Sequence, residues 1–322
     1  MSQINFMAED NVLRKLSKIG DPLERLNKYI DWNLFVKIIN GVFNANYSKG
    51  GRPPFERLMM FKLLILQRLY NISDDQAEYQ INDRLSFRRF LGLSMSDIVP
   101  DAKTIWLYRE TLVKAGVIET LFQLFYQELE IRDIIAHEGS INDASFVEAP
   151  KRRKKKGDNK HSNRQIDEDA KWTKKGNISY FGYKNHAKVD ARSKVITDYD
   201  VTSANVHDSQ VFTQFYSEYE SDTAYADSAY IGQELPENIK QEICERAYRN
   251  KPLTDEQKEE NRRKSKVRAR IEHVFGFVEG HMHGSTFRGK GRSRAAFNIG
   301  LTNLIYNMER YTFFRRAGLC TA

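Results

Sequence analysis

The sequence has few cysteines and no long apolar stretch. Cys244 and Cys320 are the only two, and two cysteines so far apart form neither a disulfide framework nor a cysteine metal site. No apolar run is long enough to span a membrane, and the first residues lack the apolar core of a signal peptide. These absences exclude a secreted disulfide scaffold and a membrane span, and they favour a protein of the reducing cytoplasm.

Positive charge, by contrast, is abundant. The 322 residues carry a formal net charge of +8, and the pI is near 9.2. The cations concentrate in three segments, residues 151–156, 262–270 and 287–294. This distribution favours a polyanionic partner, and nucleic acid is the first candidate. Apolar residues make up 40% of the chain, so a folded core is expected, and the length allows two domains.

The first part of the chain has helical spacing throughout. Ser73 and Gln76 form a capping box that begins a helix, and Asp101 is suited to begin another. No strand-like alternation interrupts the pattern, so residues 1–132 are predicted to form an all-helical domain. The predicted helices cover residues 23–43, 55–70, 74–90, a segment from 101 onward, and 117–129.

Residues 133–322 combine strands with helices. Their patterns predict strands at residues 139–149, 178–190, 194–202, 223–227 and 243–249. The polar tract from Pro150 to Asp169 has almost no apolar side chains, and we expect a mobile basic loop at about residues 150–170. Thr254 with Gln257 begins a long helix, and a final helix covers residues 294–311. The fold class is therefore α+β or α/β, with a helical domain followed by a mixed-sheet domain.

The long helix carries a carboxylate at the end of a cationic run. Six of the nine residues from Arg262 to Arg270 are cations, and Glu272 follows them. Apolar residues between Val267 and Val278 recur at helical spacing and form a stripe that faces a core. Glu272 lies at the polar margin of this stripe, one turn after Arg268. It can therefore point toward the sheet, while the neighbouring cations can meet phosphates.

Two aspartates stand in predicted strands, where aspartate is disfavoured. Asp143 interrupts one strand, and Asp227 ends another. A carboxylate near a buried sheet is costly unless it is paired or bound to a metal. With Glu272 they supply hard oxygen ligands for two Mg²⁺ ions, or for Mn²⁺, which would activate a water or a 3′-hydroxyl. Spacing alone leaves another interpretation equally open: Asp143 ends a strand, Asp227 caps a turn, and Glu272 pairs with Arg268.

Five pieces of the sequence are more distinctive. They are RPPFERLMMFKLLILQRLYNISDDQAEYQINDRLSFRRFLGL, PDAKTIWLYRETL, INDASFVEAP, DEDAKWTKKGNISYFGYKNHAKVD, and YADSAYIG followed by RARIEHVFG. In this order they resemble the DDE transposases of bacterial insertion sequences, of the IS-five-like group, over about residues 45–310. The resemblance implies a ribonuclease-H-like catalytic domain. It assigns metal binding and catalysis to Asp143, Asp227 and Glu272.

The resemblance also implies an activity and partners. The protein would bind the terminal inverted repeats of its own element, cleave double-stranded DNA at the ends, and join the 3′-hydroxyls to target DNA. Joining two ends implies a homodimer or higher oligomer on DNA, in a cytoplasmic, nucleoid-associated setting. Relatives often carry a tyrosine seven residues before the glutamate and a lysine seven after it, where this chain has Ser265 and Glu279. This departure keeps two alternatives open: a transposase-derived DNA-binding protein without catalysis, and a ribonuclease-H-like nuclease.

Candidate DNA contacts come from three places. Cations flank Glu272 on the long helix. A lysine and a histidine share one face of the strand at 178–190, where they would contact a phosphate or be polar residues of an edge strand. In the helical domain, the helices that follow Ser73 and Asp101 are suited to a helix-turn-helix reader of DNA. The candidate contacts are Arg268, Arg270, Lys266, Lys184, His186, Lys103 and Arg109. Asp208, which precedes a predicted helix, is expected to cap that helix rather than bind a ligand.

Overall fold

The computed structural model describes residues 6–43, 53–151, 166–219, 222–248 and 251–319. Most of the predicted basic loop, residues 152–165, lies outside these ranges. The chain divides into two compact units, one of Met1–Phe125 with Met308–Ala322, and one of Tyr126–Asn307. The last segment packs in the first unit, although the sequence assigned it to the second domain, because Tyr311 contacts Phe125 edge-on with ring centroids 6.3 Å apart.

The first unit is helical. Its helices are α1 (Phe6–Ile19), α2 (Pro22–Tyr29), α3 (Asn33–Val42), α4 (Arg57–Tyr70), α5 (Asp74–Asp83), α6 (Leu85–Leu91), α7 (Ala102–Ala115), the start of α8 (Ile118–Ile131) and the end of α12 (Arg292–Ala317). Both predicted caps are present: Ser73 Oγ accepts from Gln76 N at 3.2 Å, and Asp101 Oδ1 accepts from Thr104 N at 2.7 Å. None of the described helices is long and apolar enough to cross a membrane.

Two predicted helices are each divided in the structure. The segment 23–43 is interrupted after α2, where Ile30 is extended and Asp31 Oδ1 accepts from Asn33 N to begin α3. The segment 74–90 is interrupted at Arg84, whose backbone is also extended (φ −107°, ψ 117°). The breaks cover three residues (30–32) and one residue (Arg84), and helical periodicity continues across such short breaks, so the sequence pattern alone does not reveal them.

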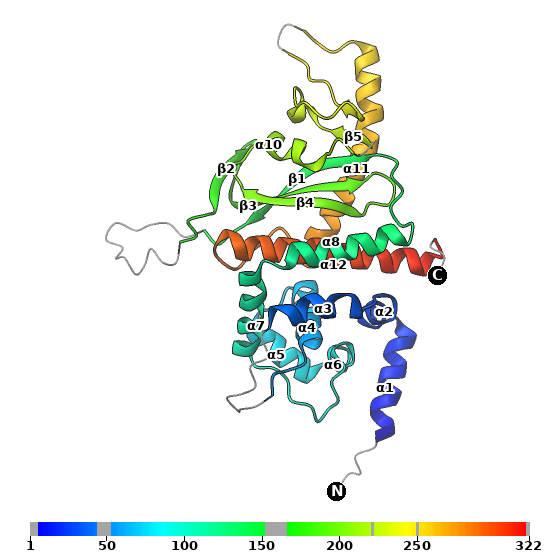
Figure 1. Ribbon diagram of the computed structural model, residues 1–322, viewed down its shortest axis with the longest axis vertical. Helices are drawn as coiled ribbons and strands as arrows, with labels where there is room; N and C mark the ends of the chain where they lie inside the picture. The colour runs from blue at the N-terminus through cyan, green and yellow to red at the C-terminus, as the bar shows by residue number, and fades with distance from the viewer. Residues whose placement is uncertain (1–5, 44–52, 152–165, 220–221, 249–250, 320–322) are drawn as a thin grey trace, which may run out of the picture. The chain divides into compact units, whose positions relative to one another are not determined.

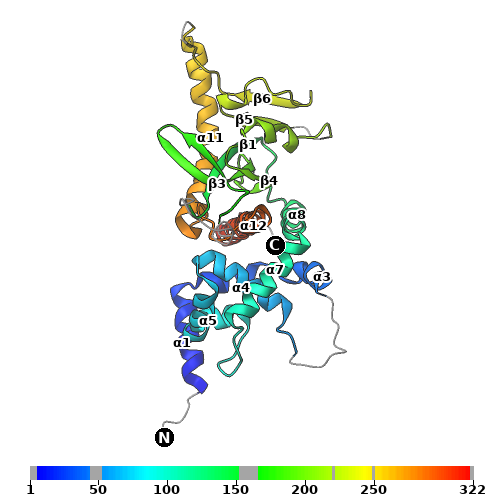
Figure 2. The same cartoon turned by 90° about the vertical axis from the view of Figure 1, so that its left-hand side faces the viewer.

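The second unit is built on one mixed sheet (Figures 1 and 2). Its strands are β1 (Ser140–Glu148), β2 (Lys171–Lys175), β3 (Ile178–Asp190), β4 (Ile196–Ser203), β5 (Asp222–Ala226) and β6 (Ile239–Ile243). Their order is β2-β3-β1-β5-β6, with β4 paired to β3 on the same side as β2. β1, β5 and β6 are parallel, and the remaining pairs are antiparallel.

The strand predicted at residues 243–249 is wrong. The strand there is β6, which ends at Ile243. The next backbone groups are bound elsewhere: Glu245 N donates to Asn261 Oδ1 at 2.8 Å, and Glu245 O accepts from Asn261 Nδ2 at 2.9 Å. Because a helical side chain satisfies these groups, the chain leaves the sheet. β2, by contrast, is a strand that the sequence pattern did not predict.

Helices and a short turn-rich segment cover the two faces of the sheet. On one face, α12 is joined to β3 by paired amides, with Asn185 Nδ2 donating to Asn303 Oδ1 at 2.9 Å. The long helix α11 (Asp255–Met282) lies against β1 and β5. On the other face, Lys188 of β3 donates to Phe215 O at 3.0 Å, at the end of the segment that contains α10 (Ser209–Phe212). β3 is therefore covered on both faces, and its residues are buried from Phe181 to Asp190.

Candidate active site

The register of two parallel strands brings two acids together. β1 and β5 pair Ser140 with Ala224 and Ile141 with Tyr225. Two residues further along each strand lie Asp143 and Asp227. Because paired parallel strands hold residues of equal register side by side, Asp143 within β1 and Asp227 directly after β5, far apart in sequence, lie close in space. Their charges interact: the carboxylate of Asp227 contributes to raising the pKa of Asp143.

Asp143 has the electrostatics of a functional acid. Burial raises its pKa above the ordinary aspartate value, and the Ala144 N–H, which donates to Asp143 Oδ1 at 2.8 Å, opposes this. Arg268 of α11 also opposes it, with Nη2 at 3.8 Å from Asp143 Oδ2. The net shift is upward, so the folded protein holds an acid whose charged form it does not fully compensate. Such an acid is typical of catalytic and metal-binding sites.

Asp227 is held by the turn that it caps. Its Oδ1 accepts from Ala229 N at 2.8 Å, and its carbonyl oxygen accepts from Tyr230 N at 3.2 Å. The Tyr230 ring is buried and packs against Phe212 with centroids 4.8 Å apart. Burial is the main cause that raises the pKa of Tyr230, and the nearby acids Asp143 and Asp227 add to it. The capped turn therefore fixes the direction of the Asp227 carboxylate.

Glu272 lies on the helix that covers these strands, but it does not close a three-acid cluster. It is exposed, beside the buried Ile271 and Val274 of the predicted apolar stripe. Among the described residues, no three His, Cys, Asp or Glu side chains are close enough to hold one metal ion. The structure thus brings Asp143 and Asp227 together and leaves Glu272 outside a metal-sized cluster. The chemistry of the donors, all carboxylate oxygens, fits a hard divalent cation.

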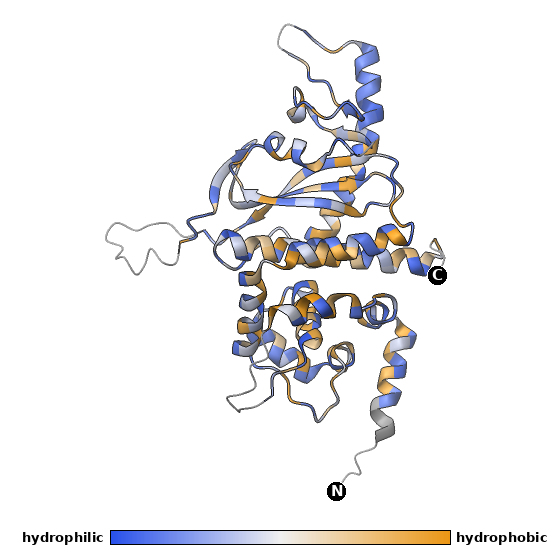
Figure 3. Ribbon diagram, in the orientation of Figure 1, coloured by the Kyte–Doolittle hydropathy of each residue, from blue (hydrophilic) through white to orange (hydrophobic). Residues whose placement is uncertain are grey.

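Much of the cationic run on α11 is paired within the protein. Arg262 bonds Glu259 at 2.9 Å, Arg263 bonds Glu242 at 2.8 Å, and Lys264 donates to Ile243 O at 3.0 Å. Lys266 and Arg270 are exposed, although Arg270 also donates to Ala191 O at 2.6 Å. Figure 3 shows the first half of α11 as polar over its visible surface. Of the predicted contacts on this helix, Lys266 and Arg270 are thus the two on the surface.

The two predicted contacts on β3 are buried. Lys184 is 7% exposed and donates to Asp208 Oδ1 at 2.8 Å and to Val206 O at 2.7 Å. His186 is 2% exposed, its Nε2 lies 2.8 Å from Thr202 Oγ1, and burial lowers its pKa to about 4. β3 is an interior strand rather than an edge strand. Buried and paired inside the fold, these side chains are not presented to a DNA surface in this structure.

Asp208 has a different role from the one its sequence position predicts. Its side chain makes no capping hydrogen bond to α10 and instead accepts from Lys184. The sequence does contain a hint of the Lys184–Asp208 pair. A lysine buried in an interior strand needs a carboxylate partner, and Asp208 directly precedes α10, the first helix after β4.

In the first unit, the two predicted contacts differ. Lys103 is exposed near the start of α7. Arg109 makes two hydrogen bonds of 2.7 Å with the Asp74 carboxylate, which join α7 to α5. Arg109 therefore positions the two helices of the predicted DNA reader, and its guanidinium is already bound.

The two positions that depart from the family pattern are both exposed. Ser265 Oγ lies 3.8 Å from the Cys244 sulfur, on the part of α11 that precedes Arg268. Glu279 lies on the surface of α11 near its other end.

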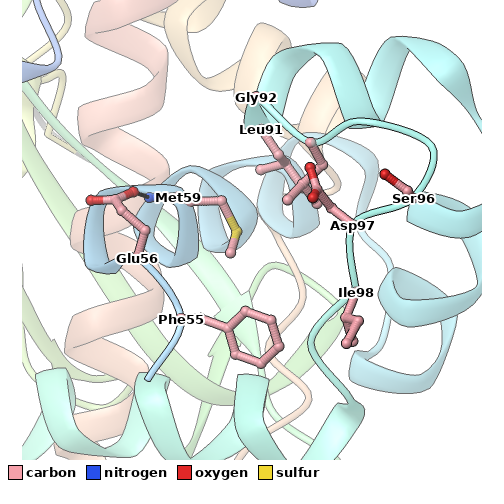
Figure 4. A pocket seen from close by; sticks show the side chains of 9 residues that line it. Phe55, Glu56, Met59, Leu91, Gly92, Ser96, Asp97 and Ile98 are labelled. Carbon is pink, nitrogen blue, oxygen red and sulfur yellow. Dashed lines mark hydrogen bonds between the residues drawn. The ribbon is translucent and has the colours of Figure 1, made fainter. Parts of the chain in front are cut away.

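A pocket of about 560 Å³ lies in the helical unit, between the start of α4 and the turn after α6 (Figure 4). Phe55, Met59 and Ile98 give it an apolar wall. Its two carboxylates already accept backbone hydrogen bonds: Glu56 caps α4 and accepts from Leu58 N at 2.8 Å, and Asp97 accepts from Ser94 N at 2.6 Å in the turn after α6. Both acids of this pocket are thus engaged within the protein.

Comparison with known families identifies the family of the chain that carries these two aspartates. Residues 135–308 match the family described as "Transposase DDE domain", and residues 11–111 match the family described as "Transposase domain (DUF772)". The chain belongs to the DDE transposase family. The match spans both aspartates, Glu272 and the whole sheet. The protein is therefore a DNA transposase of the DDE type, as the resemblance implied.

A solved structure supports the fold of this DDE transposase. It is described as a cryo-EM structure of a piggyBac transposase synaptic complex with hairpin DNA. It has a TM-score of 0.50 and 14% sequence identity, and the likeness covers 95% of this chain and 77% of that one. At this identity it shows the fold alone. The predicted fold class, a helical region followed by a ribonuclease-H-like mixed-sheet domain, is confirmed.

Proposed function

We propose that this DDE transposase binds the terminal inverted repeats of its own insertion sequence and carries out Mg²⁺-dependent cleavage and strand transfer there. The observation that carries the proposal is the proximity of Asp143, within β1, to Asp227, directly after its parallel neighbour β5. On the resemblance of its motifs we assign it to the IS-five-like group. The domain roles follow: residues 1–132 recognise DNA, and residues 133–322 carry the chemistry.

Three acids would hold the metal in this proposal. Asp143, Asp227 and Glu272 supply only carboxylate oxygens, and Mg²⁺, or Mn²⁺ in its place, prefers such ligands. Two bound ions would activate a water or a 3′-hydroxyl and stabilise the leaving oxygen. Glu272 lies on α11, the helix that covers both strands, so the third ligand comes from a separate element.

The chain's own residues prepare the site for a phosphate. The raised pKa of Asp143 marks a carboxylate whose charge the fold leaves partly uncompensated. Arg268, beside Asp143, offers a guanidinium to a scissile phosphate that arrives at the acids. The turn from Asp227 to Tyr230 holds the second carboxylate in place. No serine, cysteine or histidine nucleophile is needed.

DNA is the proposed partner, at the element ends and at the target. The structural relative is described in a synaptic complex with DNA, and this chain carries a net charge of +8, which suits a polyanion. Lys103 on α7 is the exposed candidate contact in the helical unit, and Lys266 and Arg270 are the candidates near the acids. Since strand transfer joins two ends, we propose a homodimer or higher oligomer on DNA.

A cleavage assay tests the proposal. Purified protein is incubated with end-labelled duplex that carries the ends of its own element, with Mg²⁺ and, separately, with a chelator. We expect nicking at the element ends only with Mg²⁺, and its loss in Asp143→Asn. Glu279→Gln, an exposed acid on the same helix, is the matched control and should retain cleavage. Binding of the ends without nicking would support a DNA-binding protein without catalysis, and cleavage of unrelated DNA would support a general nuclease.

A further inference from the structure

The edge strand β2 is a basic surface with an exposed aromatic ring. Its sequence is KWTKK, and Lys171, Trp172, Lys174 and Lys175 are all exposed. It pairs with β3 through a two-residue turn in which Gly176 has a positive φ of 59°. Residues 171–177 contain three lysines and no acid. In the strand order β2 lies at the opposite end from β5 and β6, and Figure 1 shows β2 and β5 on opposite sides of the sheet.

Lysines on an edge strand can be explained simply as a way to prevent pairing with another strand. The exposed tryptophan does not fit that explanation. Trp172 is 54% exposed, so a large apolar ring faces water beside the lysines. The ring is held in place: it contacts Phe181 with centroids 5.1 Å apart, and Lys151 Nζ lies 5.9 Å from its centroid. A ring that is both oriented and exposed is suited to stack on a flat partner.

β2 is also coupled to the acids. Lys175 Nζ lies 6.0 Å from the ring centroid of Phe146, which follows Asp143 on β1. Phe146 stacks on Tyr180 of β3 at 4.3 Å and 7°, so β1 and the hairpin are packed together here. The charge of Lys175 is among those that lower the pKa of Asp143. A DNA strand whose scissile phosphate reached Asp143 would therefore have the charge of Lys175 nearby.

We infer that β2 binds unpaired DNA next to the cleavage site: the lysines contact phosphates, and Trp172 stacks on an exposed base. The inference rests on the proposed function, because it takes Asp143 and Asp227 as the place where DNA is cut. Alternating cations and an aromatic ring are the combination that binds single strands, with stacking worth roughly 1–3 kcal/mol per base. The partner is thus DNA with a locally unpaired segment rather than intact duplex.

Binding of two fluorescent probes to the full-length protein tests this. One probe is a blunt duplex, and the other is the same duplex with a single-stranded tail. Trp172→Ala should weaken binding of the tailed probe by about 5- to 150-fold, which is the stacking free energy of one base, and change blunt-duplex binding little. Trp172→Phe should restore most of this affinity. Tyr219→Ala, which removes another exposed ring of the same unit, is the control and should change neither.

Salt dependence tests the lysines. Replacing Lys171, Lys174 and Lys175 with glutamine should lower the slope of log affinity against log salt on the tailed probe. The expected decrease is roughly 0.7 for each phosphate that a lysine neutralises. Lys240→Gln, on the opposite edge strand β6, should leave the slope unchanged.

Equal weakening of both probes by Trp172→Ala, or no weakening of either, would overturn the inference.

The result separates this inference from the proposed function. If Asp143→Asn abolishes nicking while Trp172→Ala binds the tailed probe normally, the role of β2 is wrong and the transposase site stands. If Asp143→Asn leaves nicking intact, the proposed site itself is wrong, whatever Trp172 does.

Discussion

The guanidinium of Arg268 on α11 lies 3.8 Å from the carboxylate of Asp143 on β1. This ion pair joins the helix that carries Glu272 to the strand that carries the first aspartate. It does not neutralise Asp143, because burial outweighs it and Asp227 adds a like charge, so the pKa stays raised. The Arg268 Nε is buried without a hydrogen-bond partner in the described part of the chain. Both ends of the pair are thus incompletely satisfied, which is expected where a ligand completes the site.

The first prediction is that Asp143→Asn makes the metal-free protein more stable while it abolishes cleavage. The amide keeps the acceptor for Ala144 N–H and removes a charge that burial disfavours. We expect a gain of about 1 kcal/mol at neutral pH, or about 2–4 °C in Tm for a chain of this size. Thermal melts in chelator measure it, with Glu237→Gln, an exposed acid, as the control that should not move.

The pH dependence of that gain follows from the direction of the shift. An acid whose pKa is raised on folding binds its proton more tightly in the folded state. Ionisation of Asp143 therefore lowers stability as pH rises from the ordinary aspartate value of 3.8 through the raised one. The advantage of Asp143→Asn should be complete above the raised pKa and vanish below 3.8. An advantage that is the same at acid and neutral pH would contradict the shift.

The second prediction concerns metal binding without activity as the readout. If the acids hold Mg²⁺ in the folded protein as proposed, Mg²⁺ should raise Tm. The expected gain in the free energy of unfolding is about 2.7 kcal/mol at a hundredfold excess over Kd. Asp143→Asn and Asp227→Asn should reduce this gain. Glu272→Gln decides whether the exposed glutamate is the third ligand, because removal of a ligand reduces the gain. Glu279→Gln, seven residues further along α11, should retain the full Mg²⁺-dependent gain in stability. Equal reductions in Glu272→Gln and Glu279→Gln would contradict the assignment of Glu272 as the third ligand.

How much of the fold and of the site could be predicted from the sequence depends on whether a feature is set by residues close together in the chain. The capped starts at Ser73, Asp101 and Thr254 are confirmed, because a cap is set by residues within one turn. The parallel pairing of β1 with β5 is not local. Only strand register shows that Asp143 and Asp227 lie close together, and the sequence indicated it through family resemblance rather than through spacing.

The sequence did not predict which of the candidate DNA contacts are buried or already paired in the fold. Lys184 and His186 look like surface residues in GYKNH, yet they lie under the segment 206–216, whose position is set by tertiary packing. Arg109 likewise looks like a DNA contact until its two bonds to Asp74 are seen. In each case a long-range partner decides whether a cation is structural or available to DNA.

The third prediction follows from the buried pair of Lys184 and Asp208. Lys184→Met keeps most of the volume but leaves Asp208 and the Val206 carbonyl without their donor. We expect a decrease of roughly 1–3 kcal/mol in the free energy of unfolding. The salt slope of DNA binding should stay as in the wild type, because a buried ammonium releases no counterions. A lower slope with normal stability would restore Lys184 as a DNA contact.

The last prediction concerns a glycine that sets the distance between β1 and β3. Gly182 has a φ of 152°, and a Cβ there would lie 2.7 Å from Ala149 N and closer still to the Val147 carbonyl oxygen. Gly182→Ala must therefore push β1 away from β3, and since β1 carries Asp143, both stability and nicking should fall. We expect the free energy of unfolding to decrease by more than about 1 kcal/mol. Gly276→Ala, in helix α11 with nothing within 4 Å of its added Cβ, is the matched control and should stabilise by about 0.5–1 kcal/mol. Urea unfolding of both variants measures the difference, and effects of the same sign would show that the close approach of the two strands does not limit the fold.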